Sequence, residues 1–188
     1  MSTTRVKNFL ITGPPGSGKS TLISCVVSEL TERGVKVGGV VTPELREHGR
    51  RVAFLMRDLL TGEEVVIASV SLGKPGPRVS KYRVDVEAID RVGAKAIQLA
   101  IKLADVIVID EVGKMELFSR NFSQQVVAAL ESNKPVLATI PLKSRIPLIE
   151  EIRMRKDSEV ILTQRARIQV LCRELSTRIL HIIRGDRG

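Results

Sequence analysis

The chain has few of the residues that build stacking platforms and metal centres. It has no Trp, one Tyr and four Phe, so aromatic residues make up 3% of its 188 residues. It has two cysteines, Cys25 and Cys172, and two histidines, His48 and His181. A zinc centre needs more ligands at ordered spacing, so none is indicated. Each cysteine lies in an apolar periodic segment, and we therefore predict two separate structural thiols.

Long apolar runs are also absent. No stretch of about 18 uncharged apolar residues occurs, which argues against a membrane-spanning helix. The opening residues, MSTTRVKN, lack the apolar segment and cleavage site of a signal peptide. We expect a soluble, cytoplasmic protein with no membrane partner, folded as one domain over residues 1–188.

Acidic residues are fewer than basic ones. The 30 Lys and Arg against 21 Asp and Glu give a formal charge of +9, which fits a polyanionic partner such as a nucleic acid or a phosphorylated small molecule. Residues 141–188 carry much of the excess and are the best candidate for a basic face. The scarcity of aromatic residues makes nucleic acid a possible but not a favoured partner. A plain solvated surface is the alternative interpretation.

Strand-like and helix-like periods alternate along the chain, which indicates an α/β fold with a mainly parallel sheet. The segment from 35 to 70 instead contains β-rich runs joined by glycine-containing turns, which predicts an antiparallel β insertion. The expected helices lie at about 19–34, 86–104, 119–131, 148–153 and 165–183. The expected strands outside the insertion lie at about 5–12, 82–86, 105–111, 135–141 and 159–163.

The glycine-rich stretch GPPGSGKS fits the pattern G-x-x-x-x-G-K-[ST], and it stands between a predicted strand and a predicted helix. Glycines let the backbone curl so that its N–H groups face phosphate oxygens, and the helix N-terminus adds a positive dipole end. Lys19 is expected to reach the β and γ phosphates, and the Ser20 hydroxyl is expected to hold Mg²⁺. The motif predicts a P-loop NTPase three-layer sandwich that binds ATP or another nucleoside triphosphate.

The apolar strand VIVIDE supplies the carboxylates that such a site needs. We expect Asp110 to hold Mg²⁺ through water beside Ser20. Glu111 follows at the carboxyl edge of the sheet, where open α/β sheets bind ligands. It is a candidate base that orients and deprotonates the water attacking the γ phosphate. The alternatives are a cap or surface acid for Asp110 and an ion-pair partner for Glu111.

Two further charged residues follow in VGKMELF. Lys114 is a candidate for neutralising the charge on the transferred group, and Glu116 is a candidate second base or the residue that positions Lys114. A surface ion pair between the two explains the pattern equally well.

The chain resembles a small nucleoside-triphosphatase family that includes thermophile enzymes and a human cancer-related NTPase. The resemblance rests on GPPGSGKST, GGVVTPELREHGRRVAFLMRDLLTG, GPRVSKYRVDVEA, DEVGKMELFS and KPVLATIP, and it spans about residues 5–165. It implies a fold of the RecA-like branch and Mg²⁺-dependent hydrolysis of ATP, GTP, CTP, UTP and similar nucleotides to diphosphates, with little base preference.

The resemblance also implies which segments contact the nucleotide. The implied phosphate-loop residues, with the next residue of the motif, are Gly13, Pro14, Pro15, Gly16, Ser17, Gly18, Lys19, Ser20 and Thr21. The implied second segment is Ile107, Val108, Ile109, Asp110, Glu111, Val112, Gly113 and Lys114. The chain departs from the family pattern at Ser80, where we expect glycine, and at Gln164, where we expect asparagine. A guanine-reading clamp of the type Asn-Lys-x-Asp is missing, since NKPV has Val136 in the last position.

The transition state needs another cation, and Arg46, Arg51 and Arg78 are candidates because they lie in or beside glycine-containing loops. For each of them taken alone, a solvated or structural arginine is the favoured interpretation.

Two other functions stay open at this point. A nucleotide or polynucleotide kinase would use RMRKD at 153–157 as a lid with phosphate-clamping arginines. A nucleic-acid-associated ATPase would use the positive charge to hold a phosphate backbone. Hydrolysis is favoured, since a kinase that excludes water has little use for a base like Glu111. The sequence does not indicate the oligomeric state.

Overall fold

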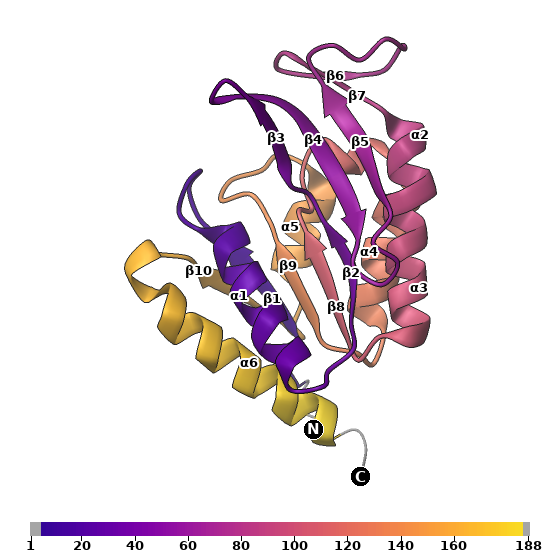
Figure 1. Cartoon of the computed structure of the whole chain (residues 1–188). Coiled ribbons are helices and arrows are strands. Elements are labelled where there is room, and N and C mark those ends of the chain that lie inside the picture. The colour runs from indigo at the N-terminus through magenta and orange to yellow at the C-terminus, as the bar shows by residue number, and fades with distance from the viewer. Residues whose placement is uncertain (1–4, 186–188) are drawn as a thin grey trace.

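The chain forms an α/β sandwich around one continuous sheet, and the computed structural model describes residues 5–185 (Figure 1). Neighbouring strands in the first half of the sheet are all parallel. In spatial order they are β10 (Ser158–Leu162), β1 (Asn8–Thr12), β9 (Val136–Thr139), β8 (Val106–Asp110) and β2 (Val37–Val41). This half confirms the predicted mainly parallel central sheet.

The second half of the sheet is antiparallel, which confirms the predicted insertion but not its bounds. Its strands are β4 (Arg50–Asp58), β5 (Glu64–Ser69), β7 (Tyr82–Val84) and β6 (Arg78–Val79), and β3 (Glu44–Glu47) pairs with β4. Strand β2, expected within the insertion, pairs in parallel with β8, and β6 and β7 extend the antiparallel part beyond residue 70. The β3–β4 hairpin projects beyond the parallel strands (Figure 1). Short-range pairing through tight turns builds this region.

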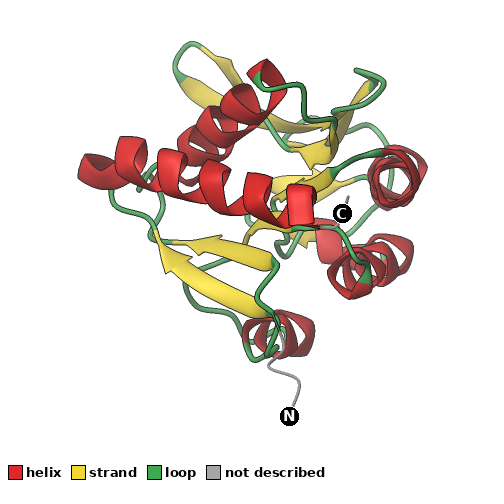
Figure 2. Cartoon of the chain, turned by 90° about the horizontal axis from the view of Figure 1, so that it is seen from below, coloured by secondary structure: helices red, strands yellow, loops and turns green. Residues whose placement is uncertain are grey.

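Helices cover both faces of the sheet (Figures 1 and 2). Helices α1 (Lys19–Glu32) and α6 (Ile168–Gly185) lie side by side on one face. The other face carries α2 (Val86–Ala88), the π-helical segment η1 (Ile89–Ala94), α3 (Lys95–Leu103), α4 (Arg120–Glu131) and α5 (Pro147–Arg153). The short 3₁₀ turns η2 (Glu116–Phe118) and η3 (Arg165–Arg167) lead into α4 and α6. No helix in the described range is long and apolar enough to cross a membrane.

The parallel strands are apolar throughout because both of their faces are covered. In β8, Ile107 and Ile109 pack into the core beneath α3, α4 and α5, whereas Val106 and Val108 pack into the core beneath α1 and α6. All four side chains are fully buried. This arrangement fixes the strand tightly and brings its last residue, Asp110, to the edge of the sheet.

The prediction of two separate thiols is wrong. Cys25 in α1 and Cys172 in α6 form a disulfide, with their Cα atoms 6.0 Å apart. The two residues are separated by 147 positions in sequence. They meet because α1 and α6 pack against each other, and the spacing of residues along a chain carries no information about such a contact.

Candidate functional site

The parallel register places the carboxyl ends of five strands at one edge of the sheet. Thr12 pairs with Leu162, Ile11 pairs with Thr139, and Val41 pairs with Asp110. The segments that follow β1, β2, β8, β9 and β10 therefore all emerge on the same side. Open α/β sheets bind ligands in this position.

The predicted phosphate loop follows β1 and leads directly into α1. Ser17 N donates to Pro14 O at 3.1 Å, which closes a turn over the exposed residues between them. Gly16 and Gly18 have φ values of 75° and 94°, which is left-handed backbone that glycine adopts without a steric cost. The Lys19 ammonium bends back over the loop and donates to Gly13 O at 2.9 Å. A curled backbone with a cation above it is suited to binding phosphate.

Asp110 ends β8 next to the start of α1. Its Oδ1 accepts a 2.6 Å hydrogen bond from Thr139 Oγ1. Burial raises the pKa of Asp110, while hydrogen bonding from Thr139 and Ser20 and the charge of Lys19 act in the opposite direction. The two residues predicted to hold a metal thus lie close enough for Ser20 to influence the pKa of Asp110. Their carboxylate and hydroxyl oxygens are ligands that suit Mg²⁺.

The carboxyl groups of Glu111 and Glu116 both lie close to Gly113. A Cβ atom built on Gly113 would lie 2.8 Å from Glu111 Oε1 and 2.9 Å from Glu116 Oε2. Burial and then the charge of Asp110 raise the pKa of Glu111, and the charges of Lys19 and Arg51 oppose this shift. Burial and then the charge of Glu111 raise the pKa of Glu116 to about 8. The three acids are close enough to influence each other's protonation.

The structure separates Lys114 from Glu116. Lys114 is exposed and makes no hydrogen bond or ion pair with any residue that the structure describes. Glu116 is 5% exposed and accepts a hydrogen bond from Gly113 N at 3.1 Å. Neither the predicted positioning of Lys114 by Glu116 nor the alternative surface ion pair is present. Glu116 instead holds the turn that follows Glu111.

Part of the implied second segment cannot reach a ligand through its side chains. Ile107, Val108 and Ile109 are fully buried in the two cores. Val112 is also buried, and its N–H donates to Thr139 O at 2.9 Å. Within this segment, Asp110, Glu111 and Lys114 carry the polar side chains at the edge of the sheet.

The three candidate arginines occupy different environments. Arg46 and Arg51 both pair with Glu44 in the β3–β4 hairpin, at 2.8 Å and 2.6 Å. Arg51 also donates to Tyr82 Oη at 3.1 Å. It is the only one of the three whose charge affects Glu111. Arg78 is exposed on β6.

The predicted kinase lid does not lie at one edge of the sheet. Arg155 pairs with Asp157 at 2.9 Å, and Asp157 O accepts from the backbone N–H of Asn8. Ser158 begins β10 level with Asn8, the first residue of β1. Arg155 and Asp157 therefore lie at the amino edge of the sheet, opposite the phosphate loop, whereas Arg153 donates to Pro141 O and Leu142 O after the carboxyl end of β9. Both arginines bind groups of the protein itself, which argues against a lid that clamps phosphate.

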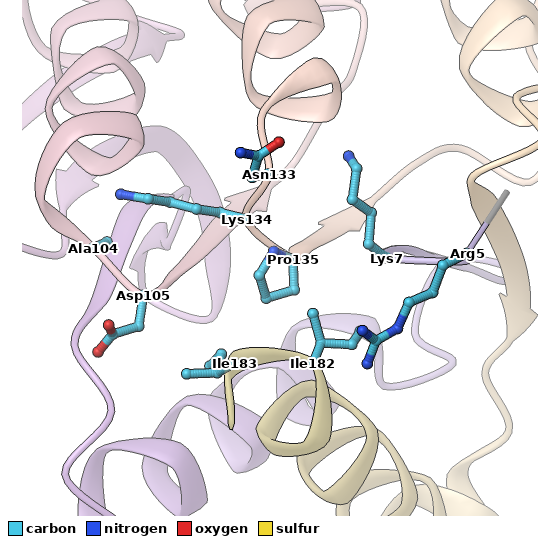
Figure 3. A pocket seen from close by; sticks show the side chains of 9 residues that line it. All are labelled: Arg5, Lys7, Ala104, Asp105, Asn133, Lys134, Pro135, Ile182 and Ile183. Atoms are coloured by element: carbon cyan, nitrogen blue, oxygen red, sulfur yellow. The ribbon is translucent and has the colours of Figure 1, made fainter. Parts of the chain in front are cut away.

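A hollow at the same amino edge gathers basic residues without forming a comparable site (Figure 3). Lys7, Lys134 and Asp105 line it, but their charged ends point in different directions (Figure 3). Lys7 Nζ donates to Leu130 O, and Lys134 Nζ donates to Ala100 O at 3.4 Å. Asn133 of NKPV also lines this hollow, so that segment lies far from a nucleotide at the carboxyl edge.

Sequence analysis missed three residues at the carboxyl edge. Thr139 binds Asp110, and Arg165 Nε donates to Gly16 O of the phosphate loop at 2.6 Å. Thr163 Oγ1 is buried without a hydrogen-bond partner among the described residues. Thr139 and Thr163 stand at the ends of predicted strands, and that position was the signal available in the sequence. Arg165 had no signal beyond following such a strand.

Comparisons with known proteins agree with this geometry. A sequence family described as NTPase matches residues 8–175. The chain belongs to this NTPase family. It is 56% identical over 134 residues to nucleoside-triphosphatase THEP1 of Thermofilum pendens, covering 71% of this chain and 73% of the relative.

Two solved structures have the same fold. THEP1 from Aquifex aeolicus matches with a TM-score of 0.79 and 29% identity, covering 92% of this chain and 98% of its own. A human cancer-related nucleoside triphosphatase matches with a TM-score of 0.78 and 36% identity, covering 93% of this chain and 97% of its own. The resemblance drawn from the motifs is thereby confirmed.

Proposed function

We propose that this NTPase hydrolyses nucleoside triphosphates at the carboxyl edge of the sheet, with Glu111 as the base that activates water. Nucleoside-triphosphate hydrolysis is the activity of the family to which the chain belongs. The observation that supports the assignment is the position of Glu111. It follows Asp110, lies near Lys19, and has a pKa raised by burial. A carboxyl group with a raised pKa is a stronger base once it is ionised.

The phosphate loop is proposed to hold the triphosphate through its backbone N–H groups and Lys19. Ser20 and Asp110 are the residues that would hold Mg²⁺, since they supply adjacent oxygen ligands next to the loop. Bound Mg²⁺ would supply charge neutralisation between the β and γ phosphates. Thr139 keeps one Asp110 oxygen in a fixed direction and leaves the carboxylate oriented toward Ser20.

Arg51 is the candidate for the additional cation. It stands on β4 in the hairpin that projects beyond the parallel strands, and its charge is felt at Glu111. Lys114 is exposed after the same acidic turn and keeps its proposed role of neutralising charge on the transferred group. Cytoplasmic localisation and the lack of base preference stay predictions, as does the absence of a required nucleic acid.

The decisive experiment measures phosphate release from ATP, GTP, CTP and UTP with and without Mg²⁺. Glu111→Gln is expected to lower kcat by about 10²- to 10⁴-fold, because the amide cannot accept the proton of water. The affinity for ADP is expected to stay near that of the parent. Glu151→Gln, an exposed substitution on α5, is the matched control and should change neither value. Undiminished kcat in Glu111→Gln would remove the base assignment.

A kinase is tested in the same assay by adding nucleoside monophosphates or polynucleotides with free 5′-hydroxyl ends. We expect labelled free phosphate and no labelled acceptor. Added RNA or DNA tests the nucleic-acid-associated alternative, which requires stimulated turnover and salt-sensitive binding.

A further inference from the structure

Arg165 is placed beside the phosphate loop by the strand at the edge of the parallel sheet. It begins η3, two residues after Thr163 and three after the last residue of β10. Its Nε donates to Gly16 O at 2.6 Å. A Cβ built on Gly16 would lie 3.8 Å from Arg165 Nη2, and one built on Gly18 would lie 3.8 Å from Arg165 Cγ. The side chain thus runs along the outer side of the loop.

The contact is supported by packing on the same side. Ile168, at the start of α6, approaches Gly18 so closely that a Cβ there would lie 2.5 Å from its Cδ1. Thr163 O would lie 3.3 Å from a Cβ built on Gly13. Glycine at these positions lets the segment from Thr163 to Ile168 lie directly against the phosphate loop. Arg165 is therefore held at the loop by its neighbours as well as by its own hydrogen bond.

The strand order gives the direction in which a bound nucleotide must run. The spatial order of the strands is β10, β1, β9, β8. The phosphate loop follows β1, the acidic pair follows β8, and Arg165 follows β10. If Glu111 activates the attacking water, the γ phosphate faces β8. The nucleoside must then leave the loop on the opposite side, toward β10. This step rests on the proposed function.

We propose that Arg165 is a nucleotide-binding residue that stacks its guanidinium on the base of the bound nucleotide. Nε is used by Gly16 O, and the two terminal nitrogens have no partner among the described residues. The guanidinium group is planar, and such groups stack on aromatic faces. Every base has such a face, so the contact adds affinity without reading the identity of the base. Arg165 would therefore favour nucleotides over inorganic polyphosphate and would not favour one base.

The experiment compares ligands with and without a base that bind the same loop and are not nucleoside triphosphates. Dissociation constants are measured by calorimetry for ADP, GDP, CDP, UDP and pyrophosphate with Mg²⁺. In Arg165→Ala the four diphosphates are expected to bind roughly five- to tenfold more weakly, which corresponds to loss of one cation–π contact. Pyrophosphate is expected to bind within about twofold of the parent value.

Arg167→Ala is the matched control, since Arg167 is exposed in the same 3₁₀ turn and makes no side-chain contact with the loop among the described residues. It should leave all five constants unchanged. Equal weakening of pyrophosphate and the diphosphates in Arg165→Ala would overturn the proposal, because it would mean that Arg165 only shapes or charges the loop. Unchanged binding of all five would also overturn it. Neither result depends on turnover, so a failed base assignment for Glu111 would be recognised separately.

Discussion

The two ends of the parallel sheet both gather charged residues, but at the amino end Lys7 and Arg155 pair with Asp157, whereas the carboxyl end places its charges beside the phosphate loop. There, Lys19, Ser20, Asp110 and Glu111 come from different segments and influence one another directly. At the amino end, Lys7 and Lys134 donate to main-chain carbonyl groups, and their ammonium groups point apart (Figure 3). A curled backbone beside the charged side chains, more than local charge, distinguishes the carboxyl end as a ligand site.

Buried hydroxyl groups without a partner in the described part of the chain occur at both ends of the sheet, and Ser158 at the start of β10 is one at the amino end. Among the described residues, the buried side-chain atoms without a partner include Ser17 Oγ, Thr42 Oγ1 and Thr163 Oγ1. These residues follow β1, β2 and β10 at the carboxyl edge. A buried hydroxyl without a partner costs free energy, and a bound ligand or water can remove that cost. Three such hydroxyl groups therefore lie at the carboxyl end, against Ser158 Oγ at the amino end.

The largest expected effect comes from removing one lysine at each end. Lys19→Ala is expected to lower kcat/KM for ATP by about a thousandfold, because an ammonium group that faces developing phosphate charge is lost. Lys134→Ala removes a cation that donates to Ala100 O at the amino end and should leave kcat/KM within about twofold. A phosphate-release assay measures kcat/KM for both variants. Comparable losses in the two variants would contradict the contrast between the ends.

The carboxyl end was also the part of the site that sequence could predict. The phosphate loop and Asp110–Glu111 are each continuous in sequence, and their flanking strands and helix follow simple periodicity. The predicted strands and helices outside the insertion correspond to those observed, with shifts of a few residues at their ends. Local sequence determines these features because the interactions that form them are local.

Contacts between distant segments could not be predicted. The Cys25–Cys172 disulfide and the Arg165–Gly16 hydrogen bond each join residues that are far apart in the sequence. A lid at RMRKD was part of the kinase alternative. The arginine content of this segment indicates its charge but not the edge of the sheet at which each side chain lies. The π-helical segment η1 within the predicted helix 86–104 was also missed, since its 6 residues are too few to reveal a period different from that of an α-helix.

The second effect concerns the disulfide, which links the helices that begin at the carboxyl edge. Reduction is expected to lower the free energy of unfolding by about 3 kcal/mol, because it releases a long loop in the unfolded chain. Hydrogen exchange should increase at residues 13–20 more than at residues 133–137, which have no such link. The double variant Cys25→Ala, Cys172→Ala should show no response to reductant. Unchanged unfolding after verified reduction would exclude a stabilising role.

The third effect is the pH dependence that Glu116 imposes on stability. Its pKa is about 8 in the folded chain and that of an ordinary glutamate when unfolded, so between these values the folded state binds the extra proton. Stability is therefore highest below the unfolded pKa and falls as the pH rises toward 8, by at most ~1.4 kcal/mol per pH unit for one proton.

Glu116→Gln should flatten that decline in metal-free buffer, since glutamine still accepts from Gly113 N but cannot ionise. Glu151→Gln, on an exposed helix position, should keep the slope of the parent. Urea unfolding at pH 5, 6, 7 and 8 measures how the free energy of unfolding changes with pH. A parent whose stability rises over this range, or a Glu116→Gln variant with the parent's slope, would show that Glu116 is not held protonated.

The smallest effect lies outside both ends, in the turn between β6 and β7. Ser80 has a φ of 55°, in the position where the family resemblance leads to glycine. Left-handed backbone costs a non-glycine residue about 1–2 kcal/mol, and the extra freedom of glycine in the unfolded chain offsets part of the gain. Ser80→Gly should therefore stabilise the chain by up to about 1 kcal/mol in urea unfolding. Lys81→Gly, at the adjacent turn position without positive φ, should not stabilise it. Phosphate release should be unchanged in both variants, because Ser80 and Lys81 are exposed and bond neither the phosphate loop nor Arg51 among the described residues, and a change in KM would connect this hairpin to the site.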